Sequence, residues 1–104
     1  MDIEKAADGF SAMGAAHRLG VLQHLVKAGE AGLQVSEIMA RSGIAASTLA
    51  HHLKALHSAG LITQEKRGRA IINRADYRHL EALAEYILHE CCMAPLAGGE
   101  TPHG

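Results

Sequence analysis

Two short helical runs, separated by three residues and followed at once by a change of period, constrain the fold most strongly. Val35–Ser42 and Ala46–Ala59 have helical spacing, and Gly43 marks the end of the first run. Two β-prone runs follow at 61–64 and 70–73, and the glycine-containing turn between them predicts a hairpin. A helix, a short turn, a second helix and a hairpin together indicate a winged helix-turn-helix.

Three further helical runs complete the predicted fold. Residues 3–16, with an apolar face, and 17–28 precede the paired helices, and helical spacing returns over 80–91. The fold class is therefore mainly α with a small β-hairpin and five helices, in keeping with a chain of 104 residues of which 31 are Ala or Leu. We expect one domain over 1–93 and a disordered tail over 94–104, which holds both prolines.

Charge is segregated along the chain although its formal sum is only -1. Residues 41–79 carry seven Lys or Arg against two acidic residues, a net charge of +5, whereas the flanking segments sum to -2 and -4. A basic middle segment favours a surface that meets a polyanion. The alternative is an ordinary solvated surface on which charges cluster by chance.

The second helix of the pair has two different faces. Leu49, Leu53 and Leu56 share one side, at spacings of four and three residues. Polar side chains point the other way, where hydroxyls and imidazoles suit base edges and a cation suits a phosphate. The candidate DNA-binding residues in this helix are Ser47, Thr48, His51, His52 and Lys54, with His52 near the boundary between the faces. A solvated helix face is the alternative.

The hairpin favours DNA binding over that alternative. Its predicted turn, 65–69, carries three cations directly after the candidate recognition helix. A cationic loop at this place can straddle the DNA backbone or enter the minor groove. The candidate DNA-binding residues in the hairpin are Lys66, Arg67 and Arg69.

Three segments resemble the ArsR/SmtB family of bacterial repressors: Gly32–Ile38, Ser47–Leu56 and Ala59–Ile62, followed by the basic hairpin. The Ser-Thr-Leu-x-His-His-Leu-Lys segment is the most specific part, and the similarity extends from about Ala16 to Cys92. This resemblance implies a homodimer on double-stranded, pseudo-palindromic operator DNA. It also implies that helices one and five form the dimer interface, and that an inducer, often a metal ion or metalloid, releases the protein from DNA.

Ala45 departs from the family pattern, in which Ser or Thr commonly caps the recognition helix. Alanine leaves the first amides of that helix uncapped, typically at a cost of about 1 kcal/mol. Our hypothesis is that these amides face a DNA phosphate instead.

Cys91 and Cys92 end the last helix and are the candidate inducer site. Adjacent thiolates suit a soft, thiophilic centre, provided that the end of the helix frays so that both sulfurs converge. Some arsenic-responsive family members are similar in carrying such a pair, with a third Cys in the tail, but the tail here has none. We therefore expect a trivalent arsenic or antimony species as the inducer, with two sulfurs best suited to a methylated arsenical, and no required cofactor.

Two other inducer chemistries stay open. Asp76 and His89 fit the spacing of zinc sensors in the family, but Arg78 replaces one His ligand and Cys92 takes the last place, so that site is damaged. The second chemistry is redox or sulfur-species sensing through the two thiols.

Several other classes of protein do not fit. No Gly-rich phosphate loop, nucleophile elbow or metal-hydrolase motif is present, so we do not expect an enzyme. No apolar run approaches the roughly 20 residues that span a bilayer. Two neighbouring cysteines cannot staple a secreted scaffold, which favours a cytoplasmic protein. A module that binds another protein is the remaining rival to DNA binding.

Overall fold

A computed structural model describes the backbone of residues 1–93 and the side chains of residues 1–89. The predicted tail over 94–104 lies outside the described residues. In chain order the elements are α1 (Ile3–Met13), α2 (Ala16–Ala28), the short 3-10 helix η1 (Gly29–Ala31), α3 (Val35–Ser42), α4 (Ala46–Ser58), β1 (Ile62–Arg67), β2 (Ala70–Ala75) and α5 (Tyr77–Met93). Over residues 1–93 the predicted winged helix-turn-helix, with five α-helices and one antiparallel hairpin, is confirmed.

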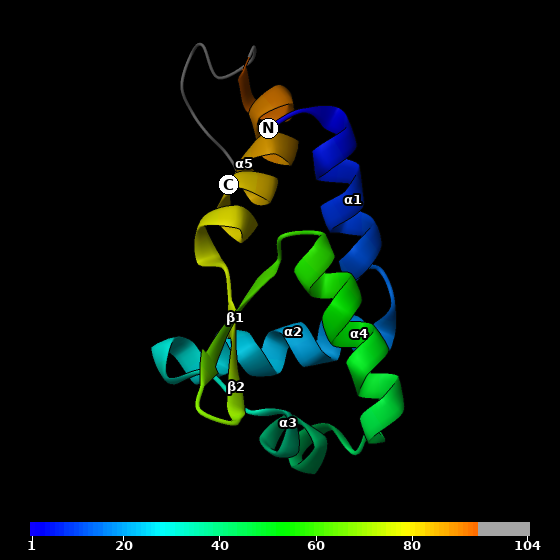
Figure 1. The fold of residues 1–104 in the computed structure, drawn as a ribbon. Helices are drawn as coiled ribbons and strands as arrows, with labels where there is room; N and C mark the ends of the chain where they lie inside the picture. Colours follow the sequence, from blue (N-terminus) through cyan, green and yellow to red (C-terminus); the bar gives the residue numbers. More distant parts are fainter. Residues whose placement is uncertain (94–104) are drawn as a thin grey trace.

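The elements divide into two ends joined by α2. Figure 1 shows α1 and α5 together at one end, and α3, the start of α4 and the hairpin turn at the other, with α2 crossing between them. Among the described residues, no helix is both long and apolar enough to cross a membrane.

Apolar residues from nearly every element meet in one core. The side chains with least exposure come from α2, α3, α4, α5 and the residue before β1: Val21, Leu25, Ile38, Leu49, Leu56, Leu61 and Leu83. Gly43 ends α3 in the left-handed conformation with φ 74°, which lets the chain turn directly into α4. The helix-turn-helix is thus fixed by leucine and isoleucine packing and by one glycine cap.

The first helix differs from the prediction in its length and in its buried face. It ends at Met13 rather than at residue 16. The predicted apolar face comprised Ile3, Ala6, Ala7, Phe10 and Met13. Ala6 is buried and Met13 packs against the core, but Ile3 is 70% exposed and Phe10 36% exposed, whereas the small residues Gly9 and Ala12 are buried instead. The reason is close packing against α5, since a Cβ on Gly9 would lie only 2.8 Å from Cδ1 of Leu83.

The hairpin is longer and its turn tighter than predicted. The register pairs Ile62 with Ala75 and Arg67 with Ala70, which leaves a two-residue turn at Gly68 and Arg69. Gly68 has φ 60°, the left-handed conformation that such turns need. The predicted five-residue turn is therefore wrong, because its first three residues continue the strand.

Candidate nucleic-acid interface

The outward face of α4 consists of exposed polar side chains, namely those of Ser47, Thr48, His51 and Lys54. The opposite face is held in the core by Leu49, Leu53 and Leu56. Ala45 occupies the N-cap position with an extended backbone and provides no side-chain hydrogen bond to the helix. The first turn of α4 therefore offers amides without a side-chain cap beside the exposed hydroxyls.

His52 lies apart from this face. Its half-buried ring stacks on His17 at the start of α2, with ring centroids 6.0 Å apart and an interplanar angle of 19°. Its Nε2 is buried without a hydrogen-bond partner among the described residues. Burial lowers the pKa of His52 below its ordinary value, and the nearby charges of Arg18, His17 and His51 lower it further. The structure thus turns His52 toward α2, while its neighbour His51 faces outward.

The three cations of the hairpin occupy different positions. Lys66 and Arg67 are adjacent on β1 and so point to opposite faces of the hairpin, while Arg69 lies in the turn. All three are exposed. The hairpin turn, α3 and the start of α4 lie at the same end of the molecule (Figure 1).

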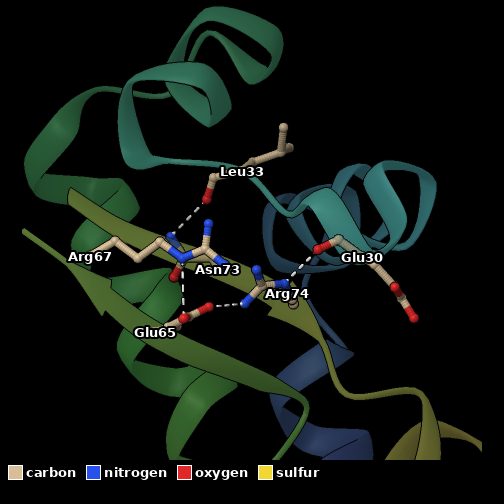
Figure 2. A network of polar contacts seen from close by, with 6 residues as sticks. All are labelled: Glu30, Leu33, Glu65, Arg67, Asn73 and Arg74. Atoms are coloured by element: carbon tan, nitrogen blue, oxygen red, sulfur yellow. Dashed lines mark hydrogen bonds and ion pairs between the residues drawn. The ribbon is translucent and has the colours of Figure 1, made fainter.

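Glu65 joins two arginines on one face of the hairpin (Figure 2). Its Oε2 accepts a hydrogen bond from Nε of Arg67 at 3.1 Å, and its Oε1 accepts one from Nη1 of Arg74 at 2.7 Å. These hydrogen bonds, first that of Arg74 and then that of Arg67, hold the pKa of the Glu65 carboxyl below its ordinary value. Arg74 also donates from Nε to the Glu30 carbonyl of η1 at 2.6 Å, which ties the hairpin to the body of the protein.

Asn73 provides a second polar anchor on the other face of the hairpin. It is fully buried, its Nδ2 donates to the Leu33 carbonyl at 3.2 Å, and its Oδ1 accepts from Nε2 of Gln64 at 2.8 Å. The Asn73 and Leu33 backbones also exchange two hydrogen bonds of 2.9 Å, forming an isolated bridge. The sequence analysis missed Glu65, Asn73 and Arg74, and only the alternation along the strands could have put Glu65 and Arg74 on one face.

The end of the molecule away from this surface exposes large apolar side chains on α1 and α5. The apolar residues whose helical spacing predicted α5 are divided, since Leu83 is buried within the protomer whereas Ile87 and Leu88 are more than half exposed. Ile3 and Phe10 of α1 are likewise exposed, and we call these four residues together the apolar end face. Exposed apolar residues on neighbouring helices are typical of an interface with another chain.

The predicted inducer site lies at the end of α5. The helix continues to Met93, so the backbones of Cys91 and Cys92 are helical, but their side chains lie outside the described residues. Asp76 accepts a hydrogen bond from the His79 amide at 3.1 Å and stands thirteen positions before His89, or roughly 20 Å along a helix. Asp76 and His89 of one protomer therefore cannot share an ion. No group of three metal-binding side chains is found within the described part of the chain.

A model described as a helix-turn-helix domain matches residues 13–65, just over half of the chain. No curated protein matches the sequence. Among solved structures, an ArsR-like transcriptional regulator from Rhodococcus sp. RHA1 shares 23% identity, covers 95% of this chain and 96% of its own, and has a TM-score of 0.71. NolR from Sinorhizobium fredii shares 29% identity over 80% of this chain and 84% of its own, with a TM-score of 0.64. A homodimeric winged helix-turn-helix DNA-binding domain from Mycobacterium bovis shares 20% identity over 97% of this chain and 90% of its own, with a TM-score of 0.69.

Proposed function

We propose that the chain, which belongs to the helix-turn-helix domain family and has the fold of an ArsR-like transcriptional regulator, is a homodimeric DNA-binding repressor released from its operator by an inducer. One observation carries this proposal: α4 exposes a polar face, and this helix starts at the same end of the molecule as the cationic turn of the hairpin (Figure 1). A helix with its apolar side buried and hydroxyls, imidazole and a cation outward suits the major groove of double-stranded DNA.

Within that surface the residues have different roles. Ser47, Thr48 and His51 of α4 face base edges, while Lys54 binds a phosphate. The hairpin binds the DNA backbone through Lys66, Arg67 and Arg69. We assign His52, which we expected to contact DNA, to the support of α4, because its ring stacks on His17.

The apolar end face supports homodimer formation. Ile3 and Phe10 of α1 and Ile87 and Leu88 of α5 are exposed in the single protomer and would be buried against their counterparts in a second copy. A two-fold axis there would leave both reading surfaces free. It would set the two recognition helices roughly 34 Å apart, one turn of DNA.

The inducer that we propose is a thiophilic metalloid, namely a trivalent arsenical, including a methylated one, or antimonite, bound by Cys91 and Cys92 when the last turn of α5 opens. These residues lie on a helix of the apolar end face rather than at the DNA surface, so the inducer would act by changing the geometry of the dimer. Release requires the inducer to prefer the weakly binding dimer by roughly 1–3 kcal/mol per site. Such a repressor would work in the cytoplasm with no membrane partner.

The test titrates a complex of the protein with its own promoter fragment, followed by fluorescence anisotropy at fixed salt. Arsenite, a methylated trivalent arsenical, antimonite, zinc, peroxide and polysulfide are added in parallel. We expect the trivalent species to release DNA from the wild type but not from Cys91→Ser/Cys92→Ser, which should still bind DNA.

The outcomes separate the alternatives. Release by zinc alone would favour a metal site that combines Asp76, His89 and Cys92 across two protomers. Release by peroxide or polysulfide alone would favour thiol-based sensing. Release that survives in the double serine variant would overturn the role of the cysteines. Failure of the wild type to bind the promoter fragment would overturn the repressor itself.

A further inference from the structure

We propose that Glu65 is an internal competitor of the DNA backbone: it binds the Arg67 guanidinium in the free protein and gives it up to a phosphate on DNA. The inference rests on the proposed DNA-binding function and names a residue that sets the affinity of the same surface. Glu65 would thus weaken binding to DNA of any base sequence.

The first argument is the chemistry of the carboxylate. Each oxygen of Glu65 accepts one guanidinium hydrogen bond, at 3.1 Å from Arg67 and 2.7 Å from Arg74 (Figure 2). A DNA phosphate offers the same kind of oxygen acceptors to a guanidinium. Glu65 is the only acidic residue of the hairpin, 62–75. Its carboxylate therefore occupies the position on Arg67 that a DNA phosphate would take.

The two arginines are held differently. Arg74 has a side chain only 24% exposed, and it keeps a hydrogen bond to the Glu30 carbonyl in addition to Glu65. Arg67 has a side chain 63% exposed, and Glu65 is its only side-chain partner among the described residues. Exposed ion pairs are worth little and exchange readily. Arg67 is thus the arginine that DNA can take, and Arg74 is the one that keeps Glu65 in place afterwards.

The pair between Glu65 and Arg67 lies next to the turn of the hairpin. Arg67 is the last residue of β1, directly before the turn at Gly68 and Arg69. This turn lies at the end of the molecule that carries the start of α4 (Figure 1). The pair between Glu65 and Arg67 therefore lies where a hairpin beside a recognition helix meets the sugar-phosphate backbone.

The consequence is a sequence-independent effect. A contact between Arg67 and a phosphate adds affinity for every duplex, because phosphates carry no sequence information. Removing the competitor should raise the affinity for operator and for scrambled DNA by the same factor. It should also steepen the salt dependence, because one more phosphate is neutralised by each protomer.

The experiment compares Glu65→Gln with the matched control Glu30→Gln. Both remove one negative charge close to the hairpin, but the Glu30 carboxylate points away from Arg74 and only its backbone carbonyl accepts a hydrogen bond (Figure 2). Affinity for the promoter fragment and for a scrambled duplex of equal length is measured between 50 and 300 mM salt. For Glu65→Gln we expect about threefold tighter binding to both duplexes at low salt, and a log–log salt slope steeper by about 0.9 for each hairpin on DNA.

A third variant isolates Arg67. In the Arg67→Gln background, Glu65→Gln should no longer tighten binding beyond the small change seen with Glu30→Gln. The inference is overturned if Glu65→Gln behaves like Glu30→Gln, if it weakens binding, or if its gain persists without Arg67. Each of these results leaves the proposed function intact when the wild type binds its promoter fragment. Failure of the wild type to bind any DNA overturns both.

Discussion

The two parts of the DNA surface, α4 and the hairpin, are held in place by different forces. Three leucines fix α4, and each is at most 4% exposed. The hairpin has Ile62 and Ala75 in the core at its base, and beyond them it is held by buried Asn73 and by ion pairs and hydrogen bonds of arginine side chains. Apolar burial leaves every polar group of the outward face of α4 free for DNA, whereas polar anchoring gives Arg67 and Arg74 partners before DNA arrives. A count of cations therefore overstates what the hairpin offers to DNA.

The largest effect should come from the apolar anchor of α4. Leu49→Ala should lower the free energy of unfolding by about 2–5 kcal/mol, because it removes a fully buried side chain and leaves a cavity. Lys54→Ala, on the outward face of the same helix, should change it by less than about 0.5 kcal/mol while weakening DNA binding. Urea unfolding measures the first quantity and anisotropy the second. A loss below about 1 kcal/mol for Leu49→Ala would contradict apolar anchoring.

The polar anchor of the hairpin should be the next most costly to remove. Asn73→Ala deletes the side-chain hydrogen bonds to Gln64 and Leu33 in a fully buried position, so we expect a loss of about 1–3 kcal/mol in unfolding free energy. Thr63→Ala, at an exposed position of β1, serves as the control and should cost less than about 1 kcal/mol. Equal losses in the two variants would mean that strand propensity, not the buried amide, holds the hairpin.

The uncapped start of α4 gives an effect of the opposite sign. Ala45→Ser should raise the free energy of unfolding by about 1 kcal/mol, since the N-cap residue has an extended backbone but provides no side-chain acceptor. If the free amides hold a DNA phosphate, the same change should weaken operator binding. Ala50→Ser, at an exposed position within α4, controls for the added hydroxyl. Higher stability with unchanged DNA affinity would leave the phosphate role without support.

The contrast between the two regions also separates what the sequence predicts from what it does not. Repeated apolar spacing predicted α4 and its buried leucines, because burial has a period that can be followed along the chain. The hydrogen bond from Arg74 to the Glu30 carbonyl joins residues 44 positions apart, and no local pattern marks it. In α1 the same periodicity was right for Ala6 but wrong for Ile3 and Phe10, since close packing on Leu83 selected small residues instead.

Among the site residues, periodicity correctly placed Leu49 opposite Ser47 and Lys54 but could not show that His52 would meet His17 from another helix. The three cations of the hairpin were predicted from the sequence. Their hydrogen-bond partners could be identified only from the pairing of the two strands. The roles of Cys91 and Cys92 stay predictions, because they depend on a ligand that no pattern in the chain identifies.

The smallest effect on the free energy of unfolding should come from His52, which lies between the polar and the apolar face of α4. The pKa of His52 is lowered by burial and by Arg18, His17 and His51, so the folded protein favours the neutral ring. As the pH falls through the ordinary value of about 6.5, the unfolded chain takes up this proton first, and the free energy of unfolding therefore decreases. Above that pH His52 contributes no such dependence.

His52→Gln should remove the contribution of His52 to this pH dependence. The unfolding free energy of the variant should therefore fall less than that of the wild type between pH 7.5 and pH 5.5. His57→Gln is the matched control, because His57 is an exposed histidine of the same helix and lies outside the stack with His17. Urea unfolding at the two pH values measures the difference. An identical decrease in wild type and His52→Gln would show that protonation of the stacked ring does not lower the free energy of unfolding. The support of α4 would then depend on its leucines alone.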